Sequence, residues 1–147
     1  MKIVLKNVFG LTLIILALVI SLAGCKSVPN IEWEFKITGA VTAPNTLTFE
    51  ELTELEQVSL NDVFMSKTYG EDEFRSFSGI PIENLFERAG ANKDMVSITA
   101  LAADGYAIEI PLADLEGGIL ALKDGGEWII DKEPESGPLR LVFPKTP

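Results

Sequence analysis

The sequence predicts an α+β domain that is rich in β-structure, with a mixed sheet and two or three short helices. Three observations predict this class. Short runs in which apolar and polar residues alternate recur along the chain. A capping box at Thr48-Phe49-Glu50-Glu51 opens one short helix, and the stretch from Pro81 to Gly90 has the apolar stripe of a second. Turns that contain glycine separate the runs, as they do in β-rich domains.

The first expected elements are two strands with the capped helix between them. Alternating residues from Phe35 predict a strand that Gly39 breaks. The capping box then starts a helix from Phe49 to Leu55. A strand from Val58 to Met65 follows, and its apolar phase shifts after Leu60, which indicates a bulge.

The middle of the chain predicts a helix and a hairpin. Pro81 lies in the first turn of the helix and Gly90 follows its last turn. Alternating residues over 96–102 and 106–110 flank Asp104-Gly105, which is typical of two strands joined by a type I′ turn.

The remaining elements are shorter. One helical turn is expected from Leu112 to Leu115, before Gly117-Gly118. Runs over 119–122 and 127–130 are expected to pair across the turn Asp124-Gly125-Gly126, and a last strand follows over 139–143.

The amino terminus has the features of a secretory signal. Lys2 and Lys6 precede an apolar run over 8–20, which is shorter than an ordinary transmembrane helix, and small residues follow it. The tetrapeptide Leu22-Ala23-Gly24-Cys25 resembles the lipobox of bacterial lipoproteins, which implies diacylglycerol on the Cys25 sulfur and cleavage before it. An uncleaved anchor helix is the alternative, and it exports the domain as well.

This signal divides the chain into three parts. We expect a lipoprotein signal peptide over 1–24, a lipidated tether over 25–33 and the domain over 34–147. Two or more acyl chains give stable anchoring, so the domain is expected to be attached to a membrane and to face outside the cytoplasm, in the periplasm or at the cell surface.

The composition excludes several classes of function. The chain has 12 Lys and Arg, 22 Asp and Glu and no histidine, for a net charge of −10. Without its signal, which holds two lysines, the net charge is about −12. Such a surface repels nucleic acid. The absence of histidine removes the commonest general base and the commonest transition-metal ligand, and lipidation would consume Cys25, the only cysteine.

Four stretches of the chain form a pattern when they are taken in order. They are Leu47-Thr48-Phe49-Glu50-Glu51-Leu52, Gly79-Ile80-Pro81-Ile82-Glu83-Asn84-Leu85-Phe86-Glu87-Arg88-Ala89-Gly90, Ala103-Asp104-Gly105-Tyr106 and Gly137-Pro138-Leu139-Arg140-Leu141-Val142-Phe143-Pro144. In this order they resemble the oxidoreductase molybdopterin-binding domain of the sulfite oxidase type, over about Phe35 to Pro144. The resemblance implies the sulfite oxidase fold and, in complete enzymes, a pyranopterin molybdenum cofactor that one cysteine sulfur holds and that transfers oxygen atoms.

The chain departs from that family pattern at the cofactor. The resemblance places Ser66 where the family has its ligand cysteine, and the chain ends soon after Pro144, where the family continues through segments that help to enclose the pterin. We therefore expect no cofactor, with molybdopterin as the alternative that the resemblance implies. No metal site is expected either, because the carboxylates of Glu71-Asp72-Glu73 lack the spacing of a calcium loop.

The candidate binding residues surround the position of the missing cysteine. Ser66, Lys67, Thr68 and Tyr69 leave a strand end and enter a loop, where hydroxyls and an ammonium group suit an anionic or polar molecule.

The resemblance adds three further candidates. Asp104 and Tyr106 match the family's Asp-Gly-Tyr turn, and Arg140 matches its terminal Pro-x-Arg motif. Each has a structural alternative: Asp104 serves the turn, Tyr106 caps the core, and Arg140 bridges a carboxylate across strands.

These observations leave two functions open. The first is a lipid-anchored, non-redox protein that binds a small ligand or an envelope partner protein. The alternative is a molybdopterin-dependent oxidoreductase or its electron-transfer subunit.

Overall fold

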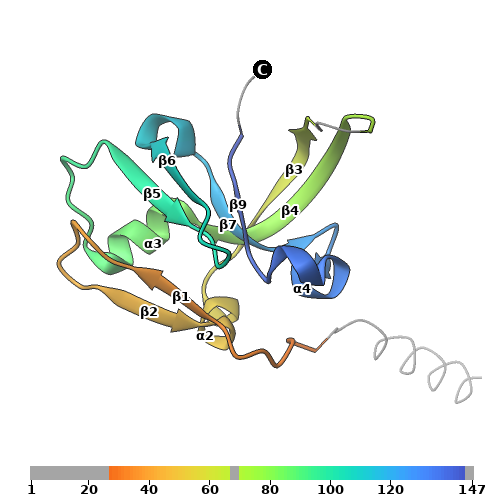
Figure 1. The fold of residues 1–147 in the computed structure, drawn as a ribbon, viewed down its shortest axis with the longest axis horizontal. Helices are drawn as coiled ribbons and strands as arrows, with labels where there is room; N and C mark the ends of the chain where they lie inside the picture. Colours follow the sequence, from red (N-terminus) through yellow and green to blue (C-terminus); the bar gives the residue numbers. More distant parts are fainter. Residues whose placement is uncertain (1–26, 67–69, 145–147) are drawn as a thin grey trace, which may run out of the picture.

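The computed structural model describes residues 27–66 and 70–144 (Figure 1). The predicted β-rich α+β class with short helices is confirmed. All strand pairs in the described part are antiparallel, so the sheets there do not combine parallel with antiparallel strands. In chain order the elements are β1 (Glu34–Ile37), β2 (Asn45–Thr48), α2 (Phe49–Glu54), β3 (Val58–Met65), β4 (Glu73–Pro81), α3 (Ile82–Ala89), β5 (Ser97–Leu101), β6 (Ala107–Pro111), the 3-10 turn η1 (Leu112–Leu115), β7 (Ile119–Asp124), β8 (Glu127–Trp128), α4 (Ile129–Lys132), the 3-10 turn η2 (Pro134–Ser136) and β9 (Arg140–Val142).

The strands form three sheets in this part of the chain. The largest has the order β3-β4-β7-β8, and β9 also pairs with β7. Strands β8 and β9 pair with successive parts of β7, because Trp128 lies opposite Lys123 while Arg140 lies opposite Ala121. The other two sheets are the ribbons β1-β2 and β5-β6.

Strand β7 lies at the centre of the core, because both of its faces are buried. Leu120 and Leu122 belong to one apolar cluster, which joins the largest sheet to α2, α3 and β2. Ile119 and Ala121 point to the opposite face, where they pack with Phe77 and other apolar side chains. This alternation follows from the period of two residues along a strand.

Both predicted helices are confirmed. Thr48 caps α2: its hydroxyl accepts a hydrogen bond from the Glu51 N–H at 3.2 Å, and the Glu51 carboxylate accepts one from the Thr48 N–H at 2.8 Å. Helix α3 begins after Pro81 and ends at Gly90, which has φ +60° and donates its N–H to the last turn.

The hairpin of β5 and β6 is confirmed, but its turn is not type I′. A type I′ turn needs positive φ at both central residues, and among the described non-glycine residues only Asp62 has positive φ. Instead the Asp104 carboxylate accepts a hydrogen bond from the Tyr106 N–H at 2.9 Å, and the Gly105 N–H donates to the Ala102 carbonyl. The side chain of Asp104 therefore stabilises a longer turn in which only Gly105 is left-handed.

Two other expectations differ from the structure. The strand expected over 127–130 ends at Trp128, and Ile129 begins α4, where its side chain is buried. The sequence also gave no indication of β4, which is the second strand of the largest sheet. The predicted bulge in β3 is present between Leu60 and Val63.

The segment before β1, residues 27–33, lies against the domain, and we call it the N-terminal strap. The buried Trp128 indole N–H donates to the Ser27 carbonyl oxygen at 3.1 Å, and the Phe49 N–H donates to the Trp33 carbonyl at 3.1 Å. Ile31 packs against the core. In residues 27–66 and 70–144 no helix is long and apolar enough to cross a membrane.

Candidate functional site

Ser66 is exposed and follows directly after the end of β3. Lys67, Thr68 and Tyr69, which we predicted as its partners, lie outside the described residues. On the adjoining ribbon, Phe64 and Phe74 face each other across β3 and β4, with ring centroids 5.5 Å apart. Both rings are largely solvent-exposed, so the end of this ribbon presents an apolar surface beside Ser66.

The Arg140 guanidinium group is paired with a carboxylate and does not face an open site. Its guanidinium group lies 2.5 Å from Glu133, and the other oxygen of Glu133 accepts a hydrogen bond from Arg75 at 2.7 Å. Arg75 also pairs with the buried Asp124, which in turn lies 3.0 Å from the Lys132 ammonium. We call these five residues the arginine–carboxylate cluster.

The cluster holds Glu133 in its charged form. Hydrogen bonds from Arg75, and then from Arg140, lower the pKa of Glu133 from 4.5 to about 2, although burial opposes the shift. Arg140 therefore bridges a carboxylate, which is its structural alternative. This carboxylate, that of Glu133, lies in the segment between α4 and η2 rather than on a facing strand.

Asp104 and Tyr106 lie in a different part of the molecule. Asp104 is exposed and its carboxylate stabilises the turn between β5 and β6. Tyr106 is 63% exposed, so it does not cap the core. No hydrogen bond or ion pair among the described residues joins this turn to Ser66 or to Arg140. Asp104 and Tyr106 therefore lie on the β5-β6 ribbon, whereas Ser66 and Arg140 belong to the largest sheet, Ser66 directly after the end of β3 and Arg140 in β9.

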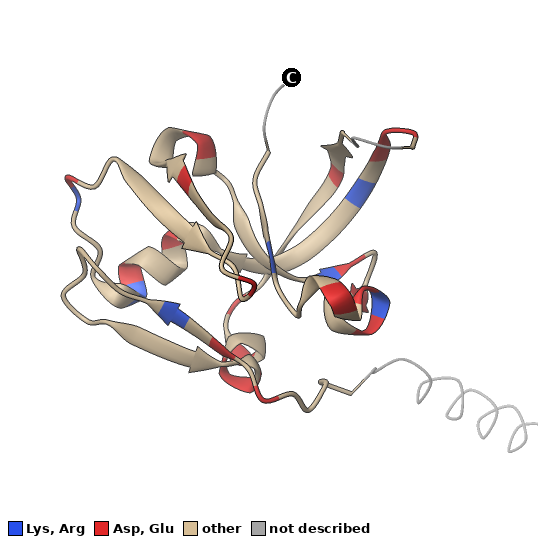
Figure 2. Cartoon of the chain, viewed as in Figure 1, with Lys and Arg blue, Asp and Glu red and all other residues tan. Residues whose placement is uncertain are grey.

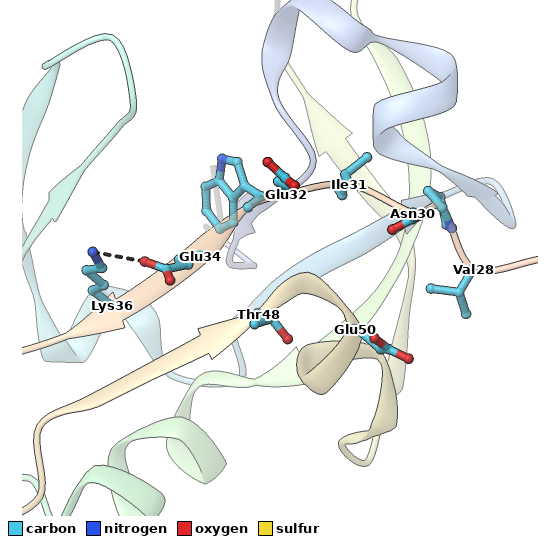
Figure 3. Close-up of a pocket in the computed structure, with 10 residues that line it drawn as sticks. Val28, Asn30, Ile31, Glu32, Glu34, Lys36, Thr48 and Glu50 are labelled. Carbon is cyan, nitrogen blue, oxygen red and sulfur yellow. Dashed lines mark ion pairs between the residues drawn. The ribbon is translucent and has the colours of Figure 1, made fainter.

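A cavity of about 920 Å³ lies between the N-terminal strap and the segment from β1 to α2 (Figure 3). Its lining includes three carboxylates, from Glu32, Glu34 and Glu50, and one ammonium group, that of Lys36, which lies 3.0 Å from Glu34. This charge disfavours an anionic ligand in the cavity. The sequence does not reveal this cavity, because its lining residues meet only when the strap docks, and the motif that includes Thr48 and Glu50 indicates a helix cap rather than a binding site.

The described residues do not fit a cysteine-ligated molybdenum. The position after β3 supplies a serine hydroxyl, and the only cysteine of the chain is Cys25. No group of three or more His, Cys, Asp or Glu side chains in the described part is arranged to hold a metal ion. Arg140, which the resemblance matched to a family motif, is paired with Glu133.

Most of the arginine–carboxylate cluster is not evident from the sequence. Arg75 lies in β4, the strand that was not predicted, and Asp124 was read only as part of a turn. One usable signal was present: the apolar run over 119–122 is followed by Lys123 and Asp124, and a carboxylate so close to a buried strand needs a partner.

Comparison with known proteins identifies the relatives of this chain. The sequence matches the oxidoreductase molybdopterin binding domain over residues 25–147. Among solved structures, a chain of the sulfane dehydrogenase SoxCD from Paracoccus pantotrophus is similar, with a TM-score of 0.66 and 19% sequence identity. The similarity covers 80% of the present chain but only 36% of that chain. No curated protein matches. The fold expected from the sequence motifs is confirmed, and the chain belongs to the oxidoreductase molybdopterin binding domain family.

Proposed function

We propose that this chain is a lipid-anchored protein outside the cytoplasm whose molybdopterin-type domain serves binding rather than redox chemistry. The bound species is a small ligand or an envelope partner protein. One observation carries the proposal: Ser66 stands where the family has its ligand cysteine, and Arg140, which matches a family motif, is already paired with Glu133.

The exposed end of the β3-β4 ribbon supports binding. Phe64 is 44% exposed and Phe74 is 68% exposed, and the two rings form one apolar surface next to the Ser66 hydroxyl. Contiguous exposed apolar surface commonly marks an interaction site.

The test is the cofactor content of the whole protein. The chain is produced in a host that makes the pterin cofactor, purified from membranes in detergent, and analysed by native mass spectrometry and by elemental analysis for molybdenum. We expect a polypeptide mass without pterin and less than about one molybdenum per ten chains. Stoichiometric pterin and molybdenum would contradict the non-redox function.

The family match favours one alternative, a molybdopterin-dependent oxidoreductase or its electron-transfer subunit. The matched control for this alternative is Ser66→Cys, which restores the family's ligand atom. If Ser66→Cys acquires molybdenum while the natural chain does not, the loss of the thiol accounts for the loss of the cofactor. If the natural chain already holds molybdenum, and Ser66→Ala and Arg140→Ala both reduce it, the alternative is supported.

The lipid anchor has its own test. We expect the membrane-derived protein to have the mass of residues 25–147 plus diacylglycerol and usually one further acyl chain. The Cys25→Ser chain should keep its first 24 residues and carry no lipid. A natural chain with an intact amino terminus and no lipid mass would contradict the anchor.

A further inference from the structure

We propose that the N-terminal strap fixes the orientation of the domain on the membrane, with the end formed by Ser27, β8 and α4 against the lipid headgroups. This inference rests on the proposed lipidation of Cys25. It replaces a free tether by a docked segment, so the lipid becomes attached to a defined face of the domain.

The strap is bonded to the domain at both of its ends. At its start, the Trp128 indole donates to the Ser27 carbonyl at 3.1 Å, and Trp128 is only 3% exposed. Its ring packs edge-on against Phe49 and lies 4.2 Å from the Lys123 ammonium, so the donor is held in place. At the end of the strap, the Trp33 carbonyl accepts a hydrogen bond from the Phe49 N–H.

Little chain remains between this docked strap and the lipid. Ser27 is two residues after Cys25, and an extended chain spans at most about 3.6 Å per residue, so their α-carbons lie within roughly 7 Å of each other. The headgroup region on one side of a bilayer is of about that thickness. Ser27 and the groups bonded to it must therefore lie at the headgroups when Cys25 carries its acyl chains.

The exposed surface at this end agrees with such a contact. Val28, the neighbour of Ser27, is 46% exposed although it is apolar. In Figure 1 the strap starts on the side of the molecule where α4 lies, whereas the end of β3 and the start of β4 lie at the top of the view. The orientation would thus direct Phe64 and Phe74 away from the membrane that holds the anchor.

The orientation can be measured with the lipidated full chain in phosphatidylcholine vesicles. Because Cys25 is acylated, an introduced cysteine is the only free thiol, and it can carry a fluorophore. We compare Asp131→Cys, in α4, with Glu71→Cys, in the turn before β4; both native residues are exposed. Lipids with a nitroxide at the headgroup should quench the label at 131 at least about threefold more than the label at 71.

Two variants test whether the strap causes this difference. Trp128→Phe keeps an aromatic ring and removes the N–H that holds Ser27. Insertion of Gly-Ser-Gly-Ser between Lys26 and Ser27 leaves every residue of the domain intact and adds about 14 Å of reach. Both changes should bring the two labels to within about 1.5-fold of each other, and the insertion decides the matter if Trp128→Phe does not fold.

The outcomes separate this inference from the proposed function. Equal quenching of both labels, in a natural chain that carries lipid by mass, overturns the orientation and leaves the anchor standing. Unequal quenching that survives the insertion overturns the role of the strap. A chain without lipid overturns both the anchor and the orientation.

Discussion

Glu133 accepts hydrogen bonds from two of the three arginines of the chain, and its charge keeps both guanidinium groups paired. We expect Glu133→Gln to lower the free energy of unfolding at pH 7 by about 1–3 kcal/mol, because two half-buried cations lose their shared carboxylate. Urea unfolding of the lipidated protein in detergent measures the change. Glu135→Gln is the matched control in the neighbouring turn, where the side chain is exposed; it should change stability by less than about 0.5 kcal/mol.

Glu133 also predicts that the free energy of unfolding depends on pH in the acid range. The pKa of Glu133 is lowered from 4.5 to about 2 in the folded protein, so the unfolded chain binds more protons between these values and stability rises with pH there. The contribution of Glu133 is complete above about pH 4.5 and is lost as the pH falls towards 2. Unfolding at several pH values should therefore show a gap between the natural protein and Glu133→Gln that closes across this window. A gap that stays constant from pH 5 to 2 would contradict the assignment.

At the same scale, the sequence predicted residue roles only where the signal was local. A turn role was the structural alternative for Asp104, and its carboxylate does accept from an N–H two residues later, a local contact that needs no distant partner, although the turn is not type I′. Arg140 was a candidate from a motif, but its role depends on Glu133 and Arg75, and no local pattern shows that they meet. The candidate residues that the motifs suggested therefore do not form one site, and Arg140 pairs instead with charged side chains that no motif indicated.

Among the elements, β4 and β7 approach so closely at Gly79 that no side chain fits. A Cβ atom there would lie 2.0 Å from the Leu120 carbonyl oxygen and 2.6 Å from the Ala121 α-carbon, and both are backbone atoms of the central strand. We expect Gly79→Ala to cost at least about 3 kcal/mol of unfolding free energy, since the sheet must open to accommodate the methyl group. Thermal unfolding checks this prediction, with Ser78→Ala on the preceding residue as the control. A cost below 1 kcal/mol would mean that the strands separate easily at this point.

The elements that sequence predicted and those that it missed differ in what defines them. Helices α2 and α3 and the β5-β6 hairpin carry their own caps and turns, so short stretches of sequence specify them. Strand β4 is defined by its neighbours: it pairs with β3 on one edge and β7 on the other, and its polar residues do not alternate cleanly with apolar ones. Tertiary packing also determines where β8 ends and α4 begins, because Ile129 starts the helix at the point where its side chain enters the core.

For the whole molecule, the balance of charge is the property that sequence specified best. Figure 2 shows Asp and Glu positions spread over α2, α3, α4 and the turn before β4, with few Lys and Arg positions between them. The chain has a net charge of −10, so the folded state carries self-repulsion that the more open unfolded chain relieves. Salt should therefore stabilise this protein, although salt weakens exposed ion pairs.

We expect the free energy of unfolding of the lipidated protein to rise by about 1 kcal/mol between roughly 0.02 and 0.5 M NaCl, as the Debye length falls below the spacing of the surface charges. The measurement is urea unfolding followed by tryptophan fluorescence. Sodium sulfate at equal ionic strength is the control, because excluded salts strengthen apolar burial as well as screening charge. Equal gains in both salts identify screening, and a gain in sulfate alone would assign the effect to burial. A loss of stability in NaCl would mean that the arginine–carboxylate cluster, rather than the acidic surface, dominates the electrostatic balance of the fold.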